Sequence, residues 1–147
     1  HVQLKKFVSA HEDGLGLMTP VKEYGSNFSA GQRQMLCLAR ALLRETKIVC
    51  LDEATASVDN ESDLLMQKVI SQEFKDKTVL TIAHRINTII ESNKVLCMSS
   101  GKVLSYDTPA KLLEDPSSIF AQLVLETGEA SAKNLKQRAN KNILEKQ

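Results

Sequence analysis

The feature that most constrains the fold is a pair of short apolar runs separated by a helix-length segment. Residues 47–51 read Lys-Ile-Val-Cys-Leu, and residues 78–83 read Thr-Val-Leu-Thr-Ile-Ala. Each run is too short for a helix, and such β-branched, apolar runs are typical of buried parallel strands. Between them, residues 60–74 repeat apolar side chains at helical intervals. Strand, helix and strand predict a right-handed βαβ unit, and therefore an α/β fold class with a parallel sheet.

A second helix is predicted over residues 30–44, just before the first strand. Its apolar positions recur at steps of three and four residues, with arginines and glutamines between them. Ser29 precedes the helix and Gln32 follows three residues later, which matches the pattern of a capping box.

The remaining segments carry weaker signals. We expect a short helix and then a loop over residues 1–26, a short helix over residues 88–91, a β-hairpin formed by 94–98 and 103–106, and two helices that begin at Thr108-Pro109. Beyond Gly128 the chain loses most of its apolar content and carries a net charge of +3. The sequence therefore predicts a flexible basic tail over residues 128–147.

The composition is that of an ordinary globular domain, because the 147 residues are 42% hydrophobic and 25% charged. This excludes a disordered protein. A net charge of +1 gives no electrostatic reason to expect a nucleic acid as partner. No apolar stretch approaches the roughly 20 residues of a transmembrane helix. The three cysteines are Cys37, Cys50 and Cys97; each lies in an apolar run, which favours buried free thiols and a cytosolic compartment.

Two parts of this pattern have the chemistry of a phosphate site. Asp52 and Glu53 follow the first strand directly, at the carboxyl end where ligands of α/β sheets bind. Ser29 and Gly31 lie at the start of a helix, where unpaired N–H groups attract anions and a glycine allows close approach. The alternatives are two solvated acids and a serine that only caps its helix.

His84 and Asp59 are further candidates. His84 ends the second strand, so it lies at the same sheet edge as Glu53 if the two strands are parallel. A neutral imidazole there can donate one hydrogen bond to a phosphate, although a lone histidine is more often structural. Asp59 precedes the helix over 60–74 and would act at least as its N-cap.

Taken in order, these segments resemble four motifs of an ATP-binding cassette, the ATPase domain of ABC transporters. Residues 27–34 (Asn-Phe-Ser-Ala-Gly-Gln-Arg-Gln) resemble the signature, 48–53 the Walker B strand, 57–59 the D-loop and His84 the H-loop. Phe28 and Ala30 stand where Leu and Gly are more usual, and both changes occur in the multidrug-resistance-associated subfamily. The resemblance covers residues 1–127, and the run from Phe28 to Asp59 looks most like the second cassette of a subfamily C transporter.

The resemblance implies a role for each candidate residue. Ser29, Gly31 and Gln32 would contact the γ-phosphate of a nucleotide held by the opposing cassette, and Asp59 would couple the two sites. Asp52 would hold Mg²⁺ through its water shell, Glu53 would polarise the attacking water, and His84 would sense the γ-phosphate. By the same resemblance, residues 1–46 form a helical subdomain with the signature, and residues 47–127 form the core from Walker B to H-loop.

One motif of the family is missing, the G-x-x-x-x-G-K-[ST] loop that binds the phosphates of ATP. We therefore expect a partial P-loop NTPase fold without the Walker A portion, and the first residue, His1, favours a piece of a longer protein. The isolated chain is expected to be inactive.

The resemblance also implies a parent protein and its surroundings. That parent would be a membrane exporter of organic anions, conjugates or drugs, with this chain at the cytosolic face of the membrane. Its partners would be the opposing cassette, the transmembrane domains and Mg-ATP, with no nucleic acid. Two other functions stay open: a truncated, non-catalytic product that binds an intact cassette, and a soluble cassette ATPase without a transport role.

Overall fold

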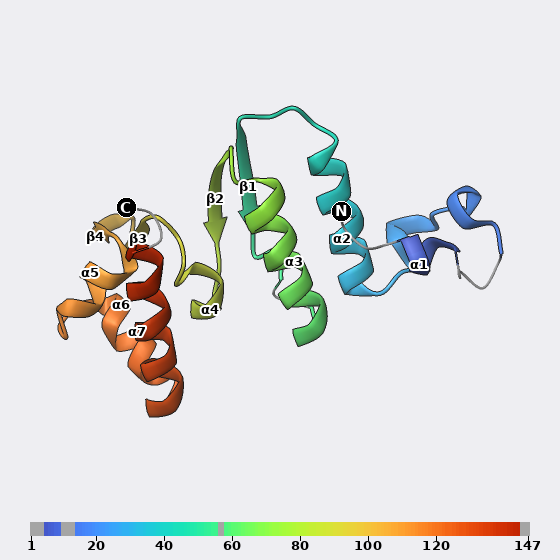
Figure 1. The fold of residues 1–147 in the computed structure, drawn as a ribbon. Coiled ribbons are helices and arrows are strands. Elements are labelled where there is room, and N and C mark those ends of the chain that lie inside the picture. The colour runs from blue at the N-terminus through green and yellow to red at the C-terminus, as the bar shows by residue number, and fades with distance from the viewer. Residues whose placement is uncertain (1–4, 10–13, 56–57, 145–147) are drawn as a thin grey trace. The chain divides into compact units, whose positions relative to one another are not determined.

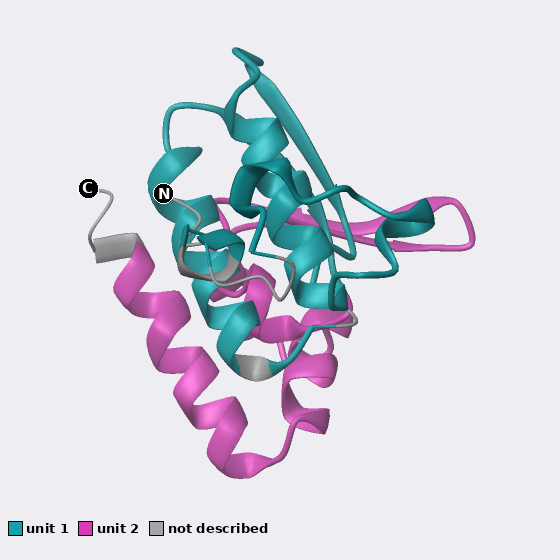
Figure 2. Ribbon diagram, turned by 90° about the vertical axis from the view of Figure 1, so that its right-hand side faces the viewer, with its two compact units in different colours: residues 1–83 teal, residues 84–147 magenta. Residues whose placement is uncertain are grey.

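The structure is a computed structural model that describes residues 5–9, 14–55 and 58–144. It divides into two compact units, His1–Ala83 and His84–Gln147, which Figure 2 colours separately. Each unit has its own hydrophobic core.

The first unit contains the predicted strand–helix–strand pattern (Figure 1). Its elements are α1 (Lys5–Ser9), the 3₁₀ turns η1 (Gly16–Met18) and η2 (Glu23–Gly25), α2 (Ala30–Leu42), β1 (Ile48–Asp52), α3 (Asn60–Glu73) and β2 (Thr78–Ile82). The helices predicted over 30–44 and 60–74 are confirmed, and so are both strands.

β1 and β2 are parallel, as the sequence predicts. Their register pairs Ile48 with Thr78 at one end and Asp52 with Ile82 at the other. The pairing continues past both ends, since the Thr78 N–H donates to the Lys47 carbonyl and the Glu53 N–H donates to the Ile82 carbonyl, each at 2.9 Å. The ladder therefore holds the backbone at the carboxyl end of β1, where the two acidic residues lie.

The core of the first unit covers one face of this sheet. The buried side chains are Met35 and Leu38 of α2, Val49 of β1, Val58, and Met66, Val69 and Phe74 in or next to α3. The prediction of strands buried on both faces is wrong for this structure, because Ile48, Leu80 and Ile82 are 57–64% exposed. A sheet of two strands with helices against one face leaves the alternate side chains uncovered. Cys50 lies on that uncovered face and Cys37 on the outside of α2, so these two thiols are exposed and not buried.

The second unit pairs a hairpin with a group of helices (Figure 1). Its elements are α4 (Ile86–Ile89), β3 (Val95–Ser99), β4 (Lys102–Asp107), α5 (Pro109–Glu114), α6 (Ile119–Glu126) and α7 (Glu129–Leu144). The predicted hairpin is confirmed as an antiparallel pair whose loop residues, Ser100 and Gly101, both have positive φ. That geometry matches the right-handed twist of the strands, which is why a glycine is favoured there. α5 begins at Pro109, as predicted, and the Thr108 side chain caps it.

The helix α7 corrects the prediction of a flexible tail for residues 129–144. Ala132, Leu135 and Ala139 lie three and four residues apart on one side of α7, and each is at most 3% exposed. They belong to a core that includes Ile90, Phe120 and Val124. Small apolar residues at helical spacing can bury a helix face even where the surrounding sequence is charged.

Candidate functional site

The first candidate residues lie at the start of α2. The Ser29 hydroxyl oxygen accepts a hydrogen bond from the Gln32 backbone N–H at 3.2 Å, and the Gln32 side-chain oxygen accepts one from the Ser29 N–H at 2.7 Å. The predicted capping box is therefore complete. In this box the two side chains act only as acceptors, and the donors are backbone N–H groups. The hydroxyl hydrogen of Ser29 and the amide NH₂ of Gln32 therefore keep the chemical capacity to donate to an anion.

The loop before α2 is fixed by its own hydrogen bonds. The Asn27 side chain accepts from the Lys22 N–H and donates to the Pro20 carbonyl, both at 3.1 Å. Arg33, one turn into the helix, donates to the Phe28 carbonyl at 2.8 Å and to the Gly25 carbonyl at 3.3 Å. Gly25 has φ of +63°, and an added Cβ would approach the Arg33 side chain to 3.0 Å. These bonds hold the backbone that leads into Ser29.

Gly31 brings α2 against the start of α3. It is buried, and a Cβ placed on it would lie 3.3 Å from the Ser62 hydroxyl oxygen and 3.5 Å from a methyl group of Val58. Ser62 in turn donates its backbone N–H to the Asp59 carboxylate at 2.9 Å. The structure thus joins the segment predicted as signature to the segment predicted as D-loop. It also gives Gly31 a packing role besides the predicted phosphate approach.

Asp59 caps α3, so the capping role considered for it is confirmed. The hydrogen bond from the Ser62 N–H lowers the pKa of this carboxyl below its usual value. A charged acceptor at a helix N-terminus is favoured by both the free N–H groups and the helix dipole. Asp59 is therefore a stable anion at neutral pH. Ser57, which the D-loop resemblance includes, lies outside the described residues.

Substituting the α2 cap is expected to destabilise the first unit. Ser29→Ala removes the acceptor for the Gln32 N–H, which typically costs about 0.5–2 kcal/mol. Equilibrium urea unfolding of the chain, followed by far-UV circular dichroism, measures the change. Ser26→Ala is the matched control because Ser26 is an exposed serine in the preceding turn. Equal losses in the two variants would contradict a stabilising cap at Ser29.

Asp52 and Glu53 lie at the carboxyl end of β1, as predicted. Asp52 is the last residue of the strand and is exposed, while Glu53 is half-buried. Glu53 has φ of +45°, a conformation that non-glycine residues adopt rarely and that is common at functional sites. The chain turns sharply here instead of continuing the strand alternation. The two carboxylates are therefore not forced onto opposite faces of the sheet.

His84 is exposed and begins the second unit, two residues after Ile82. The parallel pairing on which its prediction depended is present, since Ile82 lies opposite Asp52. Asp52 and Glu53 belong to the first unit. A shared site of His84 with these acids therefore stays a prediction.

The acidic pair fits the way Mg²⁺ is usually held beside a nucleotide. Within residues 5–9, 14–55 and 58–144, no group of three His, Cys, Asp or Glu side chains is placed to chelate a metal. Mg²⁺ does not need such a group, because it keeps several waters and is usually bound by one or two carboxylates together with substrate phosphates. An exposed Asp52 at the strand end meets that requirement.

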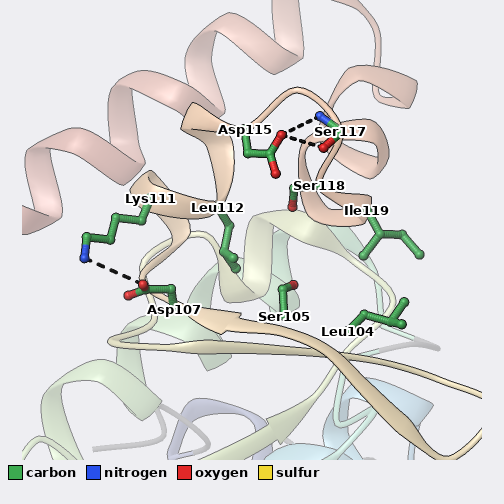
Figure 3. A pocket seen from close by; sticks show the side chains of 9 residues that line it. All are labelled: Leu104, Ser105, Asp107, Lys111, Leu112, Asp115, Ser117, Ser118 and Ile119. Carbon is green, nitrogen blue, oxygen red and sulfur yellow. Dashed lines mark hydrogen bonds and ion pairs between the residues drawn. The ribbon is translucent and has the colours of Figure 1, made fainter.

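The second unit has a separate cavity of about 430 Å³ between β4, α5 and the loop into α6 (Figure 3). Its polar groups bind one another: the Asp115 carboxylate accepts from Ser117 at 2.6 and 2.9 Å, and Lys111 lies 3.7 Å from Asp107. None of the predicted site residues lines it. The cavity therefore adds nothing to the candidate site.

The sequence prediction missed Arg33 and Ser62. Arg33 lies within the signature segment and makes two hydrogen bonds to backbone carbonyls, and Ser62 lies beside that segment in contact with Gly31. A signal for Ser62 was available, because it lies three residues after a predicted N-cap. Nothing in the local pattern around Arg33 separates it from the other polar residues of its helix.

Comparisons with known proteins agree with the family resemblance. The family described as "ABC transporter" matches residues 2–56. The chain is 56% identical over 124 residues to "ABC transporter C family MRP4" of Zea mays. It is 51% identical over 125 residues to "Vacuolar heme ABC transmembrane exporter abc3" of Schizosaccharomyces pombe. It is also 56% identical over 108 residues to "Bile pigment transporter 1" of Saccharomyces cerevisiae.

These alignments cover most of this chain but little of the relatives. They include 84%, 85% and 74% of the chain, and 8%, 8% and 7% of the three proteins. The chain thus spans less than a tenth of the length of each of these three relatives. In the part of the chain that the structure describes, no helix has both the length and the apolar content required to span a bilayer.

Proposed function

We propose that this chain binds and hydrolyses ATP within a full-length exporter, because it belongs to the ABC transporter family and resembles the nucleotide-binding domains of the C family. The observation that carries this proposal is the placement of Asp52 and Glu53. Asp52 ends a parallel strand and Glu53 follows it, and the bond from the Glu53 N–H to the Ile82 carbonyl fixes the backbone at this end. This is the edge at which α/β folds bind phosphates.

The two acids have different tasks in this proposal. Glu53 accepts a hydrogen bond from the attacking water and orients it toward the γ-phosphate, the work of a general base. Asp52 holds the water shell of Mg²⁺, and the bound ion would neutralise charge on the phosphates. The fold is then the part of a P-loop NTPase that lacks Walker A, and the phosphate loop comes from elsewhere in the protein.

The start of α2 serves the other nucleotide. Ser29 and Gln32 use acceptor atoms in the capping box, and their donor groups are directed at a γ-phosphate held by the opposing cassette. Asp59 is joined to this segment through the contact of Ser62 with Gly31. A change at the partner's site can thus be transmitted to α3. By the same resemblance, His84 acts as a γ-phosphate sensor.

We further propose that ATP hydrolysis drives export of organic anions, conjugates or drugs. Two relatives are named as a vacuolar heme exporter and a bile pigment transporter, and both names denote the transport of organic molecules. The transmembrane domains of the parent would supply the substrate path. The cassette would lie at the cytosolic face of the membrane, in contact with those domains.

Vesicle transport tests the proposed function. Inside-out membrane vesicles that contain the full-length protein are expected to accumulate a glutathione conjugate or a glucuronide with Mg-ATP and not with Mg-AMP. Both conjugates are anionic, so they probe the substrate class directly. ATP turnover without accumulation of any anion would contradict the export function and favour a non-transport ATPase. Absence of both activities in a folded protein would contradict the catalytic proposal.

A further inference from the structure

The helix α7 is bound to α4 and to Glu91, two residues after the end of α4, by polar contacts in the second unit. Arg138 donates from Nε to the Glu91 carboxylate at 2.7 Å and from Nη1 to the Asn87 side-chain oxygen at 2.9 Å. Asn142, one turn further along α7, donates to the Glu91 backbone carbonyl at 2.6 Å. We call these contacts, made by Arg138 and Asn142 of α7 to Asn87 and Glu91, the α4–α7 clamp.

The clamp holds a helix that cannot be stable without tertiary contacts. α4 has four residues, far below the length at which an isolated helix forms in water. Its end packs into the same core as α7: Ile90, which follows α4 directly, is fully buried in one cluster with Leu135 and Ala139, and Ile86 and Ile89 of α4 pack against that cluster. The core gives α4 its position, and the guanidinium fork fixes its rotation, because planar fork geometry specifies direction as well as distance.

α4 begins two residues after His84, the predicted γ-phosphate sensor. His84 is followed by Arg85, the residue that precedes the first turn of α4 and whose carbonyl accepts a hydrogen bond from the Thr88 N–H at 3.0 Å. There is thus one residue between His84 and the clamped helix. A change in the rotation of α4 is therefore expected to change the direction of the chain at His84.

We propose that Arg138 is a positioning residue for ATP hydrolysis, which acts by fixing α4 and thereby the orientation of His84. This inference depends on the proposed function. The role is one of positioning, because the Arg138 guanidinium donates to Glu91 and Asn87 within the fold. Surface ion pairs contribute little to folding stability, so the clamp acts on geometry more than on the amount of folded protein.

The test uses the full-length transporter with Arg138→Met. This substitution keeps the length of the side chain and removes its donors. We expect kcat for ATP to fall about 3- to 10-fold, because small misplacements of a catalytic group are costly, with KM for ATP unchanged. Hydrogen exchange of peptides that cover residues 84–91 is expected to become faster. Lys136→Met is the matched control, because it removes a charge from an exposed position of the same helix.

Further variants make the result decisive. Arg138→Lys keeps a charge for Glu91 but loses the fork, so it is expected to give an intermediate kcat. Asn87→Ala removes the acceptor of one Arg138 hydrogen bond and is expected to reproduce the Arg138→Met kinetics. It therefore tests the inference even if Arg138→Met does not reach the membrane. Wild-type kcat in Asn87→Ala, or equal effects of Lys136→Met and Arg138→Met, would overturn the inference.

A Glu53→Gln variant separates this inference from the proposed function. If Glu53→Gln abolishes turnover and the clamp variants do not change kcat, only the clamp is wrong. If Glu53→Gln leaves turnover intact, the assignment of Glu53 as general base is wrong, whether or not the clamp variants lower kcat.

Discussion

Glu53→Gln in the full-length transporter is expected to lower kcat for ATP hydrolysis by about 10²- to 10⁴-fold, the range typical of a lost general base. The amide is nearly isosteric with the carboxylate, but it cannot accept the proton that the attacking water gives up. The backbone bond that fixes residue 53, from its N–H to the Ile82 carbonyl, does not depend on the side chain. ATP binding is therefore expected to persist.

Steady-state release of phosphate measures the turnover, and a nucleotide-binding assay on the same membranes measures the affinity. Glu61→Gln is the matched control, because Glu61 is an exposed acid in the first turn of α3. It is expected to keep the wild-type rate. Normal turnover in Glu53→Gln would remove Glu53 from the chemistry. A parallel loss of ATP binding would assign it to ligand contact instead of proton transfer.

Phe120→Ala is expected to destabilise the second unit by about 3–5 kcal/mol, the usual cost of removing a buried aromatic side chain. Phe120 is 1% exposed and lies in the core formed by α5, α6 and α7 with Ile90 and Val95. The substitution leaves a cavity that these helices can close only in part. Since small domains are marginally stable, a loss of this size is enough to unfold a large share of the molecules.

Urea unfolding of the chain, followed by far-UV circular dichroism, gives this free energy. Leu123→Ala on the same helix is the control, because Leu123 is 42% exposed and less of its side chain is removed from water. Its expected cost is about 1 kcal/mol or less, in proportion to the smaller buried area. If both variants lose the same free energy, the buried core around Phe120 is not what stabilises this unit.

The structure reproduces the elements for which the sequence has strong local signals. The helix α2 was predictable because its apolar period and its capping box, Ser29 with Gln32, agree about where it begins. The parallel pairing of β1 and β2 was predictable because a helix-length segment between two strands requires a crossover. Asp52 and Glu53 could be placed at a sheet edge for the same reason.

The remaining features depend on contacts that a local pattern does not contain. The strands were predicted to be buried on both faces, yet the number of layers that cover a sheet is set by segments distant in sequence. α7 was missed because two of its three core residues are alanines, whose small apolar area is hidden among charged neighbours. The partners of Arg138 lie 47 and 51 positions earlier in the sequence, beyond the reach of any helical period.

The uncovered face of the first sheet also bears on the fate of this polypeptide in a cell. Ile48, Leu80 and Ile82 present apolar surface next to strand edges, and such surfaces recruit chaperones and favour pairing between chains. Quality control recognises surfaces of this kind as signs of incomplete folding. The steady-state amount of the protein is therefore coupled to whatever covers this face, because degradation removes molecules in which it stays open.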